Sequence, residues 1–396
     1  MRIMATDKTH KIPNAPNLRF PEFSGEWEAK RLGDDCEIQM CKRVFANQTS
    51  EIGDVPFYKI GTIGAEADAF ISQELYEEYR SKYNYPRHGE VLITCAGTVG
   101  KTITYKGEDA YYQDSNIVWI SNPKQYYVNS FLQRVLSRID WSKLNTTTIV
   151  RIYNDNLRDI VVFYPSKKEQ DKITNLFSLI DDRIQTQIGA IGKIESLITG
   201  ITSKVSHSNN VKKMYLKDLL MERTERNVGH HEVYSVSVSE GVVNQVEYLG
   251  RSFAAAETSH YSVARYGDII YTKSPTGSFP YGIVKRSAIP DPVAVSPLYG
   301  VYQPINENIG IYLHQYFCST INAHNYLHRL IQKGAKNTIN ITNQRFLENT
   351  VPIPDEVTLE KYVKVIDSLT QKLKNEKCLL ESYRRQKFYL LKNMFV

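Results

Sequence analysis

Two long stretches of the chain place apolar residues at steps of three and four, and neither stretch contains a proline. This spacing is typical of one helix face and of a coiled-coil seam. The sequence therefore predicts two helices of about 35 residues, roughly 50 Å long at 1.5 Å per residue. Their pairing seam is expected at Ile173, Leu176, Ile180, Ile184, Ile188 and Ile191 in the first run, and at Tyr362, Ile366, Leu369, Leu373, Leu380 and Tyr383 in the second.

Neither helix can bury its apolar stripe alone, so we expect the two to pack against each other in antiparallel orientation. A pair of this length could hold two modules over successive turns of one DNA duplex. It could equally be a stalk that keeps two domains apart for any other purpose.

The chain also repeats itself outside the helices. The segment Tyr153–Pro165 is echoed by Thr342–Pro354, and His88–Thr94 resembles Tyr266–Thr272. Self-similarity of this kind indicates duplicated structural modules. The sequence thus predicts an α+β protein in which two α/β domains with pseudo-two-fold symmetry are separated by long antiparallel coiled-coil-like helices. The expected boundaries are a flexible tail at 1–16, domains at 17–165 and 209–355, and helical spacers at 166–208 and 356–396.

Composition excludes few classes of protein. A chain of 396 residues suits two or three domains, and a net charge of +6 favours a polyanionic partner weakly. The five cysteines form no CxxC pair, which indicates neither a disulfide framework nor a zinc site and fits a reducing cytoplasm. The sequence offers no apolar run long enough for a spanning helix, so we expect no membrane association.

Polar loops at equivalent places in the two halves are candidates for DNA contact. Glycines allow close approach to phosphate, while hydroxyls, amides and cations can donate hydrogen bonds to phosphates and base edges. Plain turns and solvated loops explain the same residues. The candidates in the first half are Lys59, Thr62, Thr94, Thr98, Lys101, Thr148, Arg151 and Tyr153; those in the second half are Lys273, Ser274, Thr276, Ser278, Lys333, Lys336, Asn337 and Asn340.

Several catalytic interpretations fail on the residues themselves. The string Gly97–Thr102 lacks the first glycine of a nucleotide-binding loop, because Cys95 stands there. His324 and His328 lack the glutamate of a metalloprotease helix, and no other histidines have metal-ligand spacing. No Pro-Pro dipeptide supplies the catalytic tetrad of an adenine methyltransferase. We expect no catalytic and no metal-binding residues in this chain.

The opening Asn17–Phe23, with Trp27 and Leu32-Gly33-Asp34, and the block Pro165–Ile184, with Glu169-Gln170, resemble the specificity subunits of type I restriction-modification systems. The resemblance spans the chain, including the order of its parts. One departure is Thr358-Leu359-Glu360, which stands where the first half has Glu169-Gln170-Asp171.

The resemblance implies a non-catalytic subunit that recognises a bipartite double-stranded DNA site. It implies binding to two methyltransferase subunits and, through them, to two restriction and translocation subunits. S-adenosylmethionine, ATP and magnesium are then expected in those partners, and none in this chain. The alternatives left open are a coiled-coil assembly scaffold with no DNA role and part of a fused restriction or methyltransferase enzyme.

Overall fold

The computed structural model describes residues 4–5, 14–144, 151–249, 257–333 and 339–396. The chain divides into two compact units. Unit 1 comprises Met1–Thr186 with Leu380–Val396, and unit 2 comprises Gln187–Leu379. Each unit therefore contains one globular part together with one part of each long helix, α5 (Lys167–Ser206) and α10 (Glu356–Asn393).

Unit 1 is built on a four-stranded antiparallel sheet with the order β4-β10-β7-β8. The central strands β7 and β10 are apolar on both faces, as strands covered on both sides must be, and Trp119 of β10 pairs with Leu92 of β7. Helix α3 packs against β7 and β8. The elements are β4 (Glu37–Gln39), β7 (Val91–Thr94), β8 (Thr102–Thr104), β10 (Ile117–Ser121) and α3 (Asn129–Ser137).

Unit 2 contains a second four-stranded antiparallel sheet with the equivalent order β13-β20-β17-β18. Helix α7 packs against β18 and β20. The prediction that the two halves share one fold is thereby confirmed, since the strand order agrees element by element. The elements are β13 (Leu220–Glu222), β17 (Ile269–Tyr271), β18 (Val284–Arg286), β20 (Gly300–Pro304) and α7 (Glu307–Cys318).

The repeated sequence segments form the same substructure in both units. In unit 1, α4 (Asn154–Arg158) leads into β11 (Val161–Tyr164), which pairs with β3 (Glu28–Arg31). In unit 2, α9 (Asn343–Phe346) leads into β23 (Thr350–Pro354), which pairs with β12 (Val211–Tyr215). In each pair, a strand near the start of the globular part lies beside the strand at its end. The end strand directly precedes α5 or α10.

The remaining elements differ more between the units. Unit 1 adds a three-stranded sheet, β6-β5-β9, and unit 2 adds the pairs β14-β15, β16-β19 and β21-β22. The bounds in unit 1 are β1 (Met4–Ala5), β2 (Leu18–Arg19), α1 (Leu32–Asp35), η1 (Ala46–Gln48), β5 (Val55–Tyr58), β6 (Phe70–Ile71), α2 (Gln73–Lys82), β9 (Tyr111–Tyr112) and η2 (Trp141–Leu144). Those in unit 2 are η3 (Leu216–Asp218), β14 (Tyr234–Ser237), β15 (Gly241–Asn244), α6 (Gln245–Leu249), β16 (Ser262–Ala264), β19 (Val293–Val295), α8 (Thr320–His328), β21 (Gln332–Lys333) and β22 (Ile339–Asn340).

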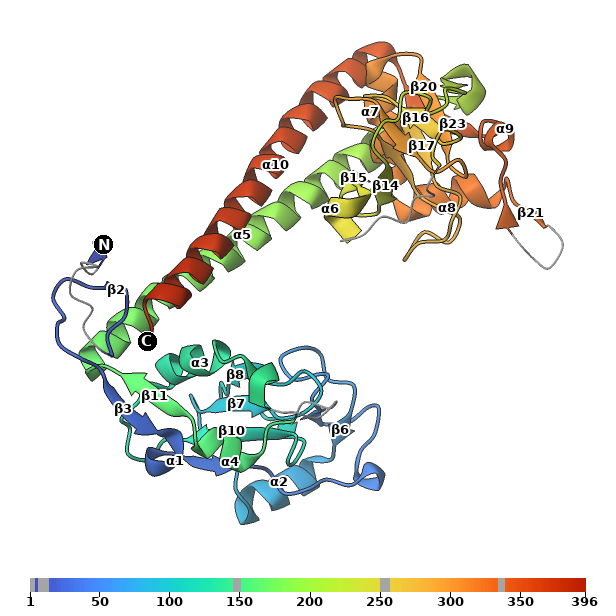
Figure 1. Cartoon of the computed structure of the whole chain (residues 1–396). Coiled ribbons are helices and arrows are strands. Elements are labelled where there is room, and N and C mark those ends of the chain that lie inside the picture. The colour runs from blue at the N-terminus through green and yellow to red at the C-terminus, as the bar shows by residue number, and fades with distance from the viewer. Residues whose placement is uncertain (1–3, 6–13, 145–150, 250–256, 334–338) are drawn as a thin grey trace. The chain divides into compact units, whose positions relative to one another are not determined.

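Helices α5 and α10 run side by side in opposite directions (Figure 1). In unit 1, Lys387 pairs with Asp181 and the Arg183 guanidinium lies 5.0 Å from the Tyr383 ring centroid. In unit 2, Lys377 pairs with Glu195, and the hydroxyls of Thr202 and Tyr362 lie 2.8 Å apart. Partner numbers rise on one helix as they fall on the other, so the predicted antiparallel pairing is confirmed.

The seam differs from the prediction at one position. Ile188 is 40% exposed, whereas Gln187 is buried at 9% and its Nε2 donates to the Glu376 carbonyl oxygen at 3.1 Å. With 3.6 residues per turn, positions 187 and 188 lie equally far from the line through Ile184 and Ile191, so the contact with α10 decides which of them is buried. The assignment of Ile188 to the seam was therefore wrong. The other first-helix positions lie on or beside the packed face: Ile173, Leu176, Ile180, Ile184 and Ile191.

The helices complete the globular cores of their units. Ile173, Phe177 and Phe395 join the core of unit 1, where the Phe395 ring stacks on Phe131 with centroids 5.3 Å apart. Ile198 and Ile366 join the core of unit 2. Each globular part is thus fixed to helix residues that are distant in the sequence. Among the described residues, no helix combines the length and the apolar character needed to cross a membrane.

Candidate nucleic-acid interface

The loops expected to contact DNA begin at two equivalent threonines. Thr94 ends β7 and Thr272 follows β17, and both are buried, at 0% and 3% exposure. The Thr94 hydroxyl accepts the Lys101 N–H at 3.1 Å and donates to the Thr98 carbonyl. The Thr272 hydroxyl accepts the Ile283 N–H, also at 3.1 Å. These buried hydroxyls therefore bond to backbone groups of their own loops and do not face solvent. On the outer surface of the first loop, the exposed candidates are Thr98 and Lys101.

In unit 1 the loop after β7 lies against two other segments. Gly97 and Gly100 have positive φ values of 65° and 82°. A Cβ at Gly97 would lie 2.7 Å from Ile60 Cδ1, and a Cβ at Gly100 would overlap the Trp141 ring. The Ile152 N–H donates to the Cys95 carbonyl at 2.9 Å. The structure thus brings together three candidate segments that are far apart in sequence.

Most cations in this cluster already have protein partners. Lys101 Nζ donates to the Ile63 carbonyl at 2.5 Å, and Lys59 Nζ lies 2.9 Å from Asp68 Oδ1. Thr62 Oγ1 accepts the Lys59 N–H at 3.1 Å. These contacts hold the 59–63 turn against the loop. A phosphate would have to exchange with the Lys59 and Lys101 partners.

Arg151 and Tyr153 lie at the other edge of the cluster. The Arg151 guanidinium is 5.8 Å from the Tyr153 ring centroid, and the Tyr153 side chain is 60% exposed. Thr148 lies outside the described residues.

In unit 2 the equivalent loop ends in a tight turn. Thr276 and Phe279 exchange two backbone hydrogen bonds of 3.0 and 2.9 Å, which leaves Gly277 and Ser278 at the tip. Ser274, Thr276 and Ser278 are exposed. Lys273 is half-buried with φ of 61°, and burial lowers the pKa of its ammonium against the opposing effect of Glu222. Lys273 therefore projects less freely than the three hydroxyls.

The last group of candidates is largely outside the described residues. Lys336 and Asn337 are among those not described. Lys333 and Asn340 lie on the paired strands β21 and β22, where Gln332 faces Asn340 and Lys333 faces Ile339.

The sequence did not predict one cluster beside the unit 2 loop, in which two exposed histidines lie against the half-buried Tyr281. The Tyr281 ring lies 5.2 Å from His324 and 5.9 Å from His328, and the two imidazoles are nearly parallel, 5.4 Å apart. The sequence indicated only two histidines one helical turn apart. No spacing signal connected them to Tyr281, which comes from the segment before β18.

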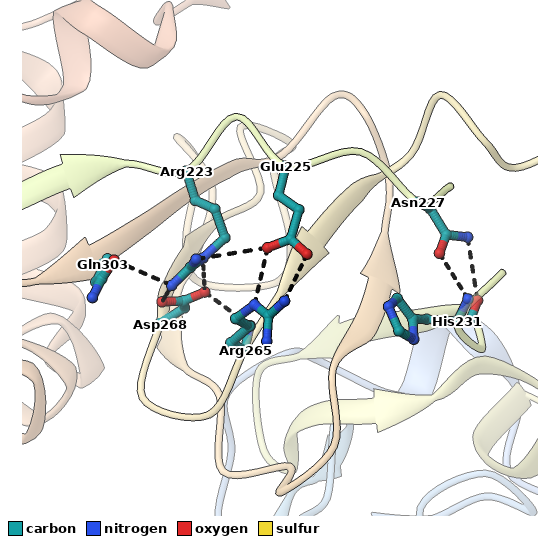
Figure 2. A network of polar contacts seen from close by, with 7 residues as sticks. All are labelled: Arg223, Glu225, Asn227, His231, Arg265, Asp268 and Gln303. Atoms are coloured by element: carbon teal, nitrogen blue, oxygen red, sulfur yellow. Dashed lines mark hydrogen bonds and ion pairs between the residues drawn. The ribbon is translucent and has the colours of Figure 1, made fainter. Parts of the chain in front are cut away.

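An ion-pair network fixes the turn that leads into β17 (Figure 2). Asp268 is 1% exposed and accepts hydrogen bonds from Arg223 Nε at 2.6 Å and from the Arg265 N–H at 2.8 Å. Glu225 pairs with the Arg265 guanidinium through bonds of 2.8 and 2.9 Å. The Arg265 hydrogen bond lowers the pKa of Glu225. The network orients the strand whose far end carries Thr272.

Unit 1 has a simpler version of the same turn. Glu90 accepts the Arg87 N–H at 2.8 Å, as Asp268 accepts that of Arg265. Gly89 and Gly267 both have φ of 86°. This positive φ explains why the repeated sequence keeps a glycine before the acidic residue. Among the described residues, no group of three or more His, Cys, Asp or Glu side chains is placed to hold a metal ion.

Comparisons with known proteins point to one family. Residues 24–196 match the family model described as "Type I restriction modification DNA specificity domain". A putative type I restriction enzyme specificity subunit, S.HindORF215P of Haemophilus influenzae, is 44% identical over 160 residues. That alignment covers 40% of this chain and 40% of the relative.

Two solved structures share the fold over nearly the whole chain. A type I restriction-modification S subunit from M. genitalium matches with a TM-score of 0.59 at 14% identity, covering 96% of this chain and 99% of the other. A chain from a structure concerned with complex assembly and conformational transition of the type I R-M system matches with a TM-score of 0.52 at 12% identity. That match covers 98% of this chain and 99% of the other. At these identities the likeness concerns the fold alone.

Proposed function

Since the chain belongs to the family of type I restriction-modification specificity subunits, we propose that it recognises a bipartite DNA sequence and carries no catalytic chemistry of its own. The observation that supports this most is the duplication. The two sheets have equivalent strand order, and each is followed by a long helix that pairs with the other. One polypeptide therefore presents two similar reading modules, as a two-fold dimer would.

We place the recognition modules at residues 17–165 and 209–355 and the helical spacers at 166–208 and 356–396. In the first module, DNA contacts are assigned to the cluster of loops around Lys59, Thr62, Thr98, Lys101, Arg151 and Tyr153. Thr94 shapes that loop from inside. In the second module, the contacts are assigned to Lys273, Ser274, Thr276 and Ser278, with Lys333, Lys336, Asn337 and Asn340 as further candidates. Thr148 remains a candidate of the first module.

The cluster of the half-buried Tyr281 with the exposed His324 and His328 extends this second surface. Aromatic and imidazole rings can stack on bases or lie against sugar rings, and histidines can donate to phosphate. The cluster borders the Thr272–Phe279 loop through Tyr281. It adds stacking rings and histidine donors to the second module, which the sequence did not suggest.

The partners in this proposal are two methyltransferase subunits and two restriction and translocation subunits. The paired helices expose large apolar side chains away from their seam, which suits protein contacts. These include Leu179 at 66%, Leu197 at 50%, Phe388 at 70% and Tyr389 at 57% exposure. S-adenosylmethionine, ATP and magnesium belong to the partners, and the complex acts in the cytoplasm. Each methyltransferase takes one adenine out of the base stack after this chain has positioned the duplex.

The proposal is tested by filter binding of the reconstituted complex to DNA over a range of salt concentrations. Sequence-dependent retention whose affinity falls steeply with salt is expected, because phosphate contacts release counterions. Retention without sequence preference, or none, supports the alternative of an assembly scaffold. Methyl transfer by the purified chain alone supports the enzyme alternative.

A further inference from the structure

A cluster of nucleophilic and basic side chains lies in unit 2, away from the loops assigned to DNA. Cys318 is the last residue of α7. Lys285 Nζ of β18 is 3.5 Å from its sulfur, and His314 Nε2, one helical turn earlier, is 3.9 Å away. Cys318 is only partly covered, because it lines a cavity of about 400 Å³. The charged residues around that cavity are Lys285, Arg286, Lys377, Glu195 and Glu240.

The hydrogen bonds of His314 orient its imidazole toward Cys318. Its Nδ1 accepts the backbone N–H of Arg286 at 3.0 Å. Because Nδ1 is engaged as the acceptor of this bond, Nε2 is the ring nitrogen left to donate. The Nε2–H therefore faces the Cys318 sulfur as a donor, and the sulfur is the acceptor.

Lys285 adds a second donor and a charge. The residue is only 7% exposed, and among the described residues no carboxylate lies within ion-pair distance of its ammonium. The neighbouring cations are already paired, Arg286 with Glu307 and Lys377 with Glu195. A buried ammonium without an anion is costly. A thiolate at Cys318 supplies the missing negative charge.

We propose that Cys318 is a thiolate in the folded protein and a site of reversible mixed-disulfide formation with low-molecular-weight disulfides. The thiolate sulfur attacks one sulfur of the reagent, a bond forms between them, and the reagent's own S–S bond breaks. The departing thiolate carries away the electron pair and takes a proton from water. Cys318 is thereby oxidised and one half of the reagent is reduced.

The electrostatics agree with this assignment. Burial alone raises the pKa of the Cys318 thiol, but its contacts with His314 and Lys285 outweigh burial and lower the pKa to about 6. Burial raises the pKa of the Tyr362 hydroxyl of α10, and the nearby Cys318 adds to that rise. The three buried thiols behave oppositely, because burial raises the pKa of Cys36 and Cys41 to about 12 and of Cys95 to about 11.

Modification has a structural consequence. A mixed disulfide is neutral, so it removes the anion beside Lys285 and adds a group to a cavity bounded by residues of α5, α7 and α10. The Thr202–Tyr362 hydrogen bond lies on the same helix seam. The thermal midpoint of the modified protein is therefore expected to fall and to recover after treatment with dithiothreitol.

The test uses the full-length chain and 4,4′-dithiodipyridine, a small neutral disulfide, with peptide mapping of the modified residue. The rate at Cys318 is expected to reach half its plateau near pH 6. An unperturbed thiol reaches that point near pH 8.5. At pH 6, the larger thiolate fraction outweighs its lower nucleophilicity and makes Cys318 about tenfold faster than an unperturbed thiol.

Matched variants separate the site from the background. Cys318→Ser should lose the reaction at pH 6, while Cys378→Ser, which removes the exposed cysteine on α10, should keep it. Lys285→Met should raise the pH at which the rate at Cys318 reaches half its plateau, because it removes the charge. Lys285→Arg should keep that pH low, because it retains the charge. Modification of wild-type Cys318 with a midpoint near pH 8.5, or a pH 6 reaction that maps to another cysteine, overturns the proposal without relying on any variant.

Discussion

Arg19 and Glu169 form a buried, two-bonded ion pair between β2 and the first turn of α5. Arg19 Nε and Nη2 donate to the two carboxylate oxygens of Glu169 at 2.8 and 2.7 Å, and Arg19 also donates to the Gly25 carbonyl at 2.5 Å. The exposed fractions are 8% for Arg19 and 1% for Glu169. The next residue, Gln170, accepts the Val128 N–H at 2.7 Å. The Glu169-Gln170 pair therefore fastens the start of α5 to two distant segments of unit 1.

Replacing Glu169 by alanine is expected to lower the free energy of unfolding of unit 1 by roughly 3 to 5 kcal/mol, because it leaves the Arg19 guanidinium buried without an anion. The matched control is Glu22→Ala, which removes the more exposed partner of Lys172 and should cost about 1 kcal/mol or less. Urea unfolding of both variants measures the difference. Equal losses in the free energy of unfolding would show that Glu169 does not hold the start of α5 to unit 1.

Gly100→Ala is expected to destabilise unit 1 by about 1 to 3 kcal/mol. The residue has a positive φ, and the added Cβ meets the Trp141 ring. Because Trp141 must move, its fluorescence should shift. Gly61→Ala is the control, since no atom lies within 4 Å of its Cβ position and its φ is not in the left-handed region. Unchanged fluorescence and thermal midpoint in Gly100→Ala would contradict the described packing.

The corrected helix seam predicts unequal losses of stability at two isoleucines of α5. Ile184→Ala should cost roughly 2 to 4 kcal/mol, because the side chain is 8% exposed and leaves a cavity. Ile188→Ala should cost under about 1 kcal/mol, because the side chain is 40% exposed. Chemical denaturation of the two variants compares them directly. A larger loss at Ile188 would restore the seam first expected from the sequence.

The Glu225–Arg265 pair predicts a specific pH dependence. The hydrogen bond from Arg265 lowers the folded-state pKa of Glu225 below its ordinary value of 4.5. The carboxylate therefore contributes stability above pH 4.5, and that contribution is lost as the pH falls through the lower folded value. The stability difference between wild type and Glu225→Gln should stay constant from pH 7 to about 5 and shrink below it. A difference that grows on acidification would contradict the pairing.

The duplication was visible in the sequence because turn glycines and helix-facing apolar residues recur in order. The order of the strands could not be predicted from the sequence, because pairing partners such as Trp119 and Leu92 are far apart in the chain and carry no local signal. Ile188 was misassigned because steps of three and of four fit equally well at Ile184. Only the position of the partner helix selects Gln187.

For a similar reason, the sequence predicted the loops of the candidate site but not the orientation of their side chains. Hydroxyls in a loop suggest donors to DNA, but a sequence does not reveal whether a hydroxyl points outward or, as at Thr94, closes the loop from inside. The cluster of Tyr281 with His324 and His328 joins two elements and could only be found in three dimensions. The Lys285–Cys318 contact is of the same kind.

The central claim is that each unit reads its own half of the DNA site, and a chimaeric chain tests it most directly. Residues 28–164 are replaced by a second copy of 211–354, since both segments begin and end on equivalent paired strands and the exchange leaves Arg19 and Glu169 in place. The chimaera is expressed with its partner subunits in cells that lack the natural chain. Sequencing of methylated adenines should then show a site whose two halves are identical and inverted, while the reciprocal chimaera should duplicate the other half. Two different halves in a methylated site of either chimaera would contradict the account.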